Sequence, residues 1–278
     1  MPSFQDHYVA ANGITTRYWT VGTGGTPLVL LHGLGGTIAD WGGTMDALAQ
    51  NRQVVAIDLL GNGRTDKPAG CTYTADALRD HILSTLEALD LDTVDLNGWS
   101  LGGRVAIAVA HERPRGVRRL VLTAPAGIGP DTIVDLNAPY HDILRQMAIR
   151  PASSAWRIFS NAVRSGGARR LASFTARRLV LASDPRARHA FLQQMRGLVG
   201  PSGYLDGARE IILRKLSELE QPILVVWGRE DYFAPFAHFA ILKKFSPHAE
   251  LAAIDRCGHT PHIEWPDVYS DAVNSFLR

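Results

Sequence analysis

Cysteine is scarce in this chain of 278 residues, and its scarcity excludes two structural classes. The two cysteines, Cys71 and Cys257, lie far apart in the sequence. Two isolated cysteines supply neither a disulfide framework nor the paired spacing of a metal site. A chain without disulfides is typical of a reducing compartment, so we expect a cytoplasmic location.

Long hydrophobic runs and an excess of one charge are also missing. No stretch approaches the roughly 20 apolar residues that a membrane-spanning helix needs, so we expect no membrane span. The N-terminal residues lack a basic start followed by an apolar run, and a secretory signal is therefore not expected. The net charge of +2 argues against a general nucleic-acid-binding protein.

The composition that remains is that of an ordinary soluble globular protein. Hydrophobic residues make up 46% of the chain and charged residues 20%, and the length fits one large domain, with or without an insertion. Lys and Arg are concentrated in the middle, where residues 131–216 hold fourteen of them against six Asp and Glu. This asymmetry indicates that the middle segment is a separate unit.

Strand and helix signals alternate along both ends of the chain. Residues 7–21 predict a β-hairpin that turns at Asn12-Gly13, which is a strong turn signal. Further strand signals, mostly continuous apolar runs typical of strands covered on both faces, lie at 27–32, 54–58, 93–97, 119–124, 222–227 and 250–254. Helices are expected between and after them, at 41–50, 74–89, 104–110, 236–245 and 266–277. This order predicts an α/β fold with a mainly parallel sheet wrapped by helices on both faces.

The middle segment breaks this alternation. It contains helix-like stretches but no convincing strand, and the stretches lie at 141–149, 155–163, 168–181 and 185–199. We therefore expect two units. One is an α/β core formed by residues 1–127 and 216–278, and the other is a helical cap, or lid, inserted at 128–215.

The sequence GWSLG at 98–102 places a serine where a strand turns into a helix. The glycines at 98 and 102 allow the two elements to approach closely, and the turn lifts the hydroxyl above the sheet edge. The helix N-terminus beneath it favours developing negative charge. This pattern matches the nucleophile elbow Gly-x-Ser-x-Gly, so Ser100 is the candidate nucleophile.

A serine hydroxyl needs a base, and the base needs an orienting carboxylate. The base candidate is His259, in a loop after the last strand that contains glycine and proline. The acid candidate is Asp231, three residues after the glycine that ends the preceding strand, because the chain order is then nucleophile, acid, base. The neighbouring acid Glu230 is expected to point in a different direction, because adjacent loop residues do, and Asp255 is expected to close its strand.

A glycine-rich loop, HGLGG at 32–36, follows the first apolar strand. Acyl transfer builds an oxyanion, which a pair of fixed backbone N–H groups stabilises. The candidate donors are the amides of Leu34 and Leu101, the second of which directly follows the nucleophile. A phosphate-binding interpretation is disfavoured because the loop has no P-loop lysine.

Together these four motifs resemble the α/β-hydrolase family, specifically its compact, lid-bearing branch of small bacterial-type hydrolases. The resemblance covers residues 1–127 and 216–278, and it includes DLLGNGRTDKP at 58–68, which is similar to a loop of that branch. It implies a mainly parallel eight-stranded sheet and a serine hydrolase of carboxylesterase type that needs no cofactor or metal. The expected partner is a small-molecule ester, cleaved through an acyl-enzyme intermediate by a monomer or small homo-oligomer.

Other members of the family leave alternatives open. Relatives of haloalkane dehalogenases and epoxide hydrolases use an aspartate nucleophile, which Ser100 excludes. Hydrolases that cleave a C–C bond in diketo acids, of meta-cleavage type, have a base loop similar to RCGH at 256–259, although this chain has Trp99 where they carry asparagine and lacks their Gly-Pro pair. Lactonases, perhydrolase-like enzymes and, from another class, a non-enzymatic ligand receptor complete the alternatives.

The resemblance also places the cap over the nucleophile, so substrate selection is expected there. Candidate substrate-binding residues are Trp99, Trp156 and Phe159, with further apolar candidates at Leu144, Met147 and Phe174. The same apolar residues are also suited to holding the cap on the core. The arginine pairs at 169–170 and 177–178 suit an anionic substrate or a solvated helix face. His262 is expected at the surface or beside the site, and Cys257 as a packing residue.

Overall fold

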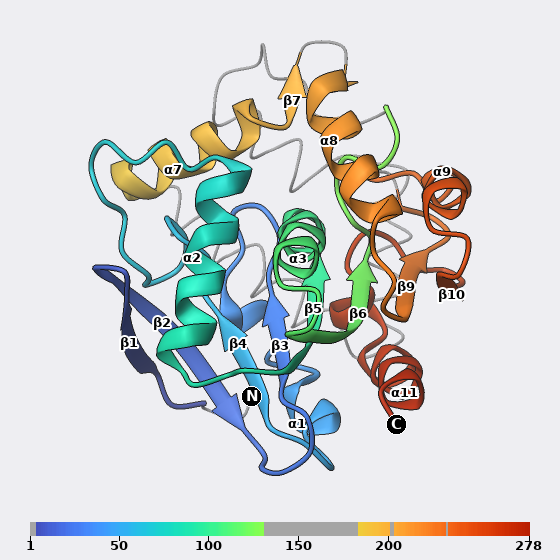
Figure 1. Ribbon diagram of the computed structural model, residues 1–278, viewed down its shortest axis with the longest axis horizontal. Helices are drawn as coiled ribbons and strands as arrows, with labels where there is room; N and C mark the ends of the chain where they lie inside the picture. The colour runs from blue at the N-terminus through green and yellow to red at the C-terminus, as the bar shows by residue number, and fades with distance from the viewer. Residues whose placement is uncertain (1–3, 131–182, 201–202, 232) are drawn as a thin grey trace.

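An eight-stranded sheet with helices on both faces forms the core of the protein (Figure 1). The computed structural model describes residues 4–130, 183–200, 203–231 and 233–278. The strands of the sheet are β1 (His7–Ala11), β2 (Ile14–Val21), β3 (Leu28–Leu31), β4 (Val54–Ile57), β5 (Val94–Trp99), β6 (Val117–Thr123), β9 (Ile223–Gly228) and β10 (Glu250–Ile254). The predicted fold class and the predicted hairpin are confirmed.

The order of the strands places the loops that carry the candidate site. The sheet runs β1-β2-β4-β3-β5-β6-β9-β10, with β1 and β2 antiparallel to their neighbours and the other six strands parallel. After β3 the chain continues to β4 on one side, and β5 pairs with β3 on the other. A crevice opens at the carboxyl ends of strands where the order reverses in this way, so β3 and β5 flank a natural binding position.

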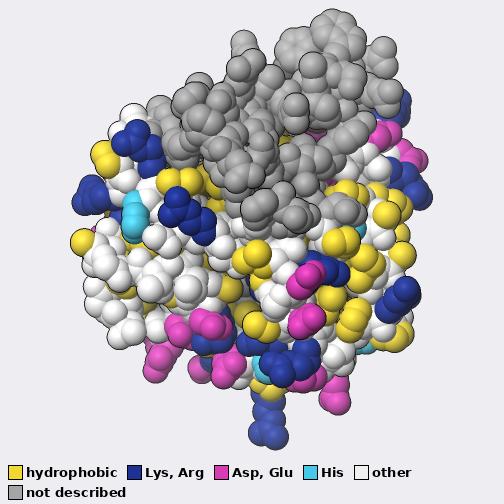
Figure 2. Space-filling model, turned by 90° about the horizontal axis from the view of Figure 1, so that it is seen from above, with side chains coloured by type: hydrophobic (Ala, Val, Ile, Leu, Met, Phe, Trp, Pro, Cys, Tyr) yellow, Lys and Arg dark blue, Asp and Glu magenta, His cyan; other side chains and the backbone are white. Residues whose placement is uncertain are grey.

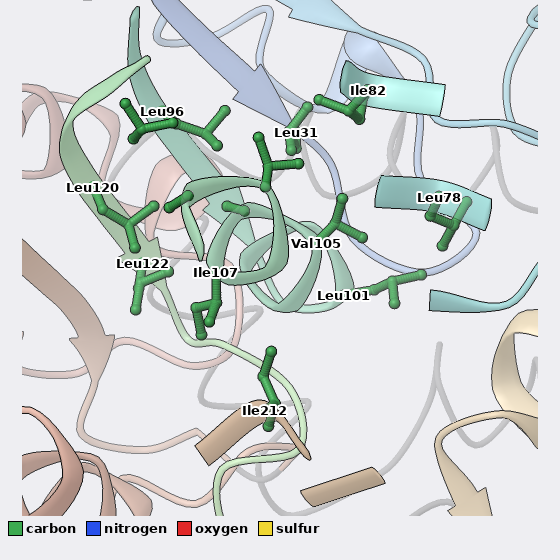
Figure 3. Close-up of a cluster of buried hydrophobic side chains, with 14 of the residues drawn as sticks. Leu31, Leu78, Ile82, Leu96, Leu101, Val105, Ile107, Leu120, Leu122 and Ile212 are labelled. Atoms are coloured by element: carbon green, nitrogen blue, oxygen red, sulfur yellow. The ribbon is translucent and has the colours of Figure 1, made fainter. Parts of the chain in front are cut away.

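Helices cover the sheet in two layers, each with its own apolar core. One layer holds α2 (Ala75–Ala88), α3 (Leu101–Glu112), α8 (Asp206–Ser217) and α9 (His238–Phe245), and the other holds α1 (Met45–Leu48) and α11 (Pro266–Phe276). Figure 3 shows α3 at the centre of the first core, where Val105 and Ile107 lie among Leu31, Leu96 and Leu120 from the strands. Helix α3 is buried along almost its whole length, which explains its alanine- and valine-rich sequence.

The helix expected at 41–50 is much shorter in the structure. A 3₁₀ turn, η1 (Ile38–Asp40), precedes a helix that begins only at Met45 and ends at Leu48. Gly42 and Gly43 stand between them. Glycine is about 1 kcal/mol less favourable than alanine inside a helix, so the pair interrupts the helix expected there.

Between β6 and β9 the structure describes part of the middle segment. It contains α7 (Pro185–Arg196), the short strands β7 (Val199–Gly200) and β8 (Gly203–Tyr204), and α8. The expectation of no strand in this segment is wrong, because β7 and β8 pair antiparallel. Strands of two residues are too short to give an alternating pattern. The expected boundary at 215/216 lies inside α8, which packs on α3.

Acidic and basic side chains are intermixed on the face shown in Figure 2. In the part of the chain that the structure describes, no helix is long and apolar enough to cross a bilayer.

Candidate active site

Ser100 lies between β5 and α3 with a strained backbone. Its φ of 54° and ψ of −115° form a conformation that non-glycine residues rarely adopt. Such strain costs on the order of 1–3 kcal/mol and persists only where the surroundings fix it. Here the Ser100 N–H donates to the Thr123 carbonyl at 2.9 Å, and the Ser100 carbonyl accepts from the Ala126 N–H at 3.1 Å. The backbone therefore holds Ser100 at the carboxyl edge of the sheet.

The two glycines of the elbow are required by close backbone packing. A Cβ on Gly98 would meet the carbonyl of Gly102, and a Cβ on Gly102 would meet the carbonyl of Leu31 on β3. Both obstacles are main-chain atoms, which cannot rotate away as a side chain can. Strands β3 and β5 and helix α3 thus approach to backbone contact directly beside the serine.

Asp231 and His259 face each other from neighbouring loops, after β9 and β10 respectively. Asp231 Oδ2 lies 2.7 Å from His259 Nδ1. A carboxylate accepts in this contact, so in the neutral imidazole Nδ1 carries the proton and Nε2 keeps its lone pair. An imidazole in that state can take a proton from a hydroxyl group.

The Asp231 carboxylate is fixed on both oxygens. Its side chain is buried, and Oδ1 accepts the backbone N–H groups of Phe233 at 2.8 Å and Ala234 at 3.0 Å. Oδ2 also accepts from Trp227 Nε1 at 3.2 Å. These donors hold the carboxylate in one orientation and satisfy a buried charge that would otherwise be costly.

The other two acids that the sequence brings into question lie differently. Asp255 is exposed and pairs with the Arg229 guanidinium at 2.7 Å. Glu230 donates its backbone N–H to the Cys257 carbonyl at 2.9 Å. Among the three acids weighed from the sequence, Asp231 is the one with a described bond to the imidazole.

The amides of Leu34 and Leu101 come from the two elements that flank Ser100. Leu101 is the first residue of α3, so its N–H has no acceptor within the helix. Leu34 follows Gly33, and a Cβ built on Gly33 would lie 3.2 Å from Ser100 Cβ. The glycine-rich loop therefore passes directly against the serine, while a role of the two amides in holding an oxyanion remains a prediction.

His32 orients one of these amides, a function that the motif alone does not show. The Leu59 N–H donates to His32 Nε2 at 3.0 Å, so the proton of the neutral imidazole is on Nδ1, which donates to the Gly33 carbonyl at 2.8 Å. The Gly33 carbonyl and the Leu34 N–H belong to one planar peptide group. A bond to the first therefore orients the second. The signal in the sequence was a polar residue at the end of a fully apolar strand.

Asp58 ties η1, which follows the glycine-rich loop, to the loop after β4. Its fully buried carboxylate accepts the N–H of Ile38 at 2.7 Å and the N–H of Arg64 at 2.9 Å. The Arg17 guanidinium, on β2, donates to the same carboxylate at 3.2 Å. The buried charge is therefore paired and hydrogen-bonded, as stability requires.

Trp99 packs between the loops that carry the candidate residues. It is buried, its Nε1 donates to the His259 carbonyl at 2.7 Å, and its ring lies 3.0 Å from a Cβ built on Gly33. His262 is fully buried, with its ring centroid 4.9 Å from that of Trp99, so the surface position considered for it is wrong and the position beside the site is confirmed. Cys257 is also fully buried, and burial raises the pKa of its thiol.

Helix α7, which belongs to the middle segment, contacts the glycine-rich loop. The ring of Phe191 lies 3.0 Å from a Cβ built on Gly35, and Gln194 Nε2 donates to the Leu60 carbonyl at 3.0 Å. Several residues weighed from the sequence lie outside the described residues: Trp156, Phe159, Leu144, Met147, Phe174 and the arginine pairs at 169–170 and 177–178.

Comparison with known proteins relates this arrangement to a large family. A family model described as the alpha/beta hydrolase fold matches residues 26–266. A 2-hydroxymuconate semialdehyde hydrolase of Pseudomonas sp. CF600 is 30% identical, and the alignment covers 97% of this chain and 92% of that protein. A 2-hydroxy-6-oxo-2,4-heptadienoate hydrolase of Pseudomonas putida F1 is 29% identical, over 97% of this chain and 95% of that protein.

Solved structures give the same architecture. A meta-cleavage product hydrolase from Pseudomonas fluorescens IP01 superposes with a TM-score of 0.77 at 26% identity, covering 98% of this chain and 97% of that one. An esterase, RhEst1 from Rhodococcus sp. ECU1013, superposes with a TM-score of 0.76 at 22% identity, covering 99% and 98% of the two chains. At that lower identity the esterase is similar in fold alone.

Proposed function

The chain belongs to the α/β-hydrolase family, and on that premise we propose that it is a serine hydrolase that cleaves a carboxylic ester of small to medium size. The proposal gives Ser100 the role of nucleophile, His259 that of general base and Asp231 that of orienting acid. The observation that supports it most directly is the 2.7 Å contact between Asp231 and His259, on the sheet edge that carries the strained serine.

In the first half of the reaction the enzyme is acylated. Ser100 Oγ attacks the ester carbonyl carbon while His259 Nε2 takes the hydroxyl proton, and the negative charge moves onto the carbonyl oxygen. The Leu34 and Leu101 amides hold that oxyanion, and the Asp231 carboxylate stabilises the imidazolium. The C–O bond to the alcohol then breaks, and the imidazolium gives its proton to the departing alkoxide.

In the second half water removes the acyl group. His259 Nε2 takes a proton from the attacking water, a second oxyanion forms, and the bond from carbon to Ser100 Oγ breaks. The proton returns to Ser100 Oγ, and the carboxylic acid leaves. The cycle needs no catalytic group beyond the residues assigned above and a water molecule. Ester cleavage is therefore the simplest chemistry that the described residues support.

The cap belongs to the same proposal. Residues 128–215 are taken to cover Ser100, with Trp99, Trp156 and Phe159 as substrate-binding candidates. The contacts of α7 with Gly35 and Leu60 support a cap seated on the loops after β3 and β4.

A second candidate is C–C bond hydrolysis of a diketo acid of meta-cleavage type. The two similar Pseudomonas hydrolases carry names of that chemistry, which favours it. The carbon leaving group then has to be protonated as the C–C bond breaks. This chain differs from the sequence pattern expected of that group in two places: it lacks the Gly-Pro pair, and it has Trp99 where asparagine is expected. The Trp99 indole N–H donates to the His259 carbonyl.

Kinetics on matched substrates distinguish the two candidates. We would assay 4-nitrophenyl esters of graded acyl length beside a ring-fission diketo acid, with wild type and Ser100→Ala. The ester proposal predicts turnover that peaks at one acyl length and falls by at least about 10⁴-fold in the variant. A preference for the diketo acid, with the esters nearly inert, would instead favour C–C bond hydrolysis as the function.

A further inference from the structure

Glu264 lies beneath the loop that carries His259, and the catalytic roles assigned above do not use it. It ends α10 (Pro261–Glu264), the short helix that follows the loop, and only 4% of it is exposed. Its carboxylate accepts the Gly258 N–H on Oε2 at 2.9 Å. Oε1 accepts the Thr260 N–H at 3.0 Å and the Thr260 hydroxyl at 2.8 Å. The residues on both sides of His259 are thus bound to one carboxylate.

Residues 255–260, which form this loop, lie outside helices and strands. Arg256 has a positive φ of 54°, and the chain enters α10 only at Pro261. Backbone N–H groups that are buried outside regular structure need partners from side chains or water. Glu264 supplies two such partners, and Trp99 Nε1 supplies a third contact at the His259 carbonyl, at 2.7 Å.

Removing a carboxylate from water costs free energy, even when the carboxylate holds a loop by hydrogen bonds. Burial raises the pKa of the Glu264 carboxyl, while the hydrogen bonds from Gly258 and Thr260 act in the opposite direction. The nearby negative charge of Asp231 raises it further. Cys257, between the two acids in sequence, is buried with its thiol pKa raised, and Arg256 lies over the Trp265 ring at 5.9 Å.

We propose that Glu264 is a positioning residue for the base, and that its carboxylate fixes Gly258 and Thr260 so that His259 keeps the orientation that Asp231 and Ser100 require. The inference rests on the function proposed above. Displacing a catalytic group by about 1 Å can cost roughly 100-fold in rate. Loosening both peptide groups that flank the imidazole should therefore lower kcat, although Glu264 itself touches no reacting atom.

The main test is Glu264→Gln, which keeps the size of the side chain but replaces one accepting oxygen with an NH₂ group. Thr260→Val is a milder variant, because it removes the hydroxyl bond and keeps the Thr260 N–H. Asp95→Asn is the matched control, since Asp95 is also a fully buried acid, bound to Arg118 at the opposite end of β5. Each protein would be assayed with its best 4-nitrophenyl ester or diketo acid and with a fluorophosphonate that reacts with activated serines.

For Glu264→Gln we expect kcat and the labelling rate of Ser100 to fall about 10- to 100-fold, with KM changed less than about threefold. A fall in kcat without a matching rise in KM separates a misplaced base from a general loss of substrate binding. For Thr260→Val we expect a fall in kcat of about two- to fivefold. Asp95→Asn should leave kcat and the labelling rate of Ser100 unchanged even if it lowers stability.

The outcomes distinguish failure of the proposed function from failure of the role proposed for Glu264. If wild type neither turned over a substrate nor reacted with the fluorophosphonate, the proposed function itself would be contradicted. An active wild type with unchanged kcat and labelling rate in Glu264→Gln would overturn the role of Glu264. Should Glu264→Gln fail to fold, unchanged kcat in Thr260→Val would overturn it as well.

Discussion

Backbone strain gathers at the carboxyl edge of the sheet. Among the described non-glycine residues with positive φ, three directly follow or nearly follow strands of the parallel sheet: Ser100 after β5, Ala124 after β6 and Arg256 after β10. Strained residues of this kind cost on the order of 1–3 kcal/mol each and cluster where function requires a fixed geometry. Two of these strained residues lie in the proposed catalytic loops: Ser100 is in the elbow, and Arg256 is in the loop that carries His259.

A second single-residue effect concerns stability rather than catalysis. His81, on α2, is buried beside Thr16, whose hydroxyl lies 2.9 Å from its Nε2. Burial lowers the pKa of His81 from 6.5 to about 4. The unfolded chain takes up the proton near pH 6.5, whereas the folded protein resists it until about pH 4, so the unfolded state binds more protons between these values.

We therefore predict that stability present above pH 6.5 is lost as the pH falls toward 4, with His81 contributing roughly 3 kcal/mol over the whole interval. Urea unfolding of wild type and His81→Gln at pH 7.5, 6 and 5 measures this. The free energy of unfolding of wild type, relative to that of His81→Gln, should be highest at pH 7.5 and should decrease as the pH falls. Parallel pH dependence in both proteins would contradict the role of His81.

At the scale of elements, the elbow depends on how closely β3, β5 and α3 approach. We predict that Gly102→Ala lowers the free energy of unfolding by about 2 kcal/mol or more, because its Cβ would meet the Leu31 carbonyl and push α3 from the sheet. The same shift would displace Leu101 and reduce turnover. Thermal and urea unfolding, together with kcat, measure both effects.

Gly207 provides the matched control in another helix. It lies in the first turn of α8, and a Cβ built on it meets no atom within 4 Å. Gly207→Ala should therefore leave stability unchanged or raise it by up to about 1 kcal/mol, the difference in helix preference between the two residues. Equal losses in Gly102→Ala and Gly207→Ala would show that close packing at the elbow is not the cause.

The elements themselves differ in how well the sequence predicts them. Buried strands such as β3 and β9 stand out because an unbroken apolar run is consistent with cover on both faces. The helix expected at 41–50 is much shorter because its place between two strands gives no weight to the cost of Gly42 and Gly43 inside a helix. Strands β7 and β8 are too short for any pattern, and they depend on pairing with each other.

At the scale of the whole molecule, sheet order brings distant residues together. Ser100, Asp231 and His259 lie far apart in the sequence, yet each follows the carboxyl end of a parallel strand, and those ends share one edge of the sheet (Figure 1). The motifs and their chain order could therefore be predicted from the sequence. The tautomer of His32 and the contacts of Glu264 could not, because both depend on loops that meet only in the folded chain.

The central claim is that Ser100 is the nucleophile, and fluorophosphonate labelling followed by mass spectrometry tests it most directly. Wild type, Ser100→Ala and the exposed-serine control Ser217→Ala would be treated in parallel. We predict one adduct, on Ser100, formed with loss of fluoride in wild type and in Ser217→Ala, and no adduct and no turnover in Ser100→Ala. An adduct on another residue, or wild-type turnover in Ser100→Ala, would contradict the account.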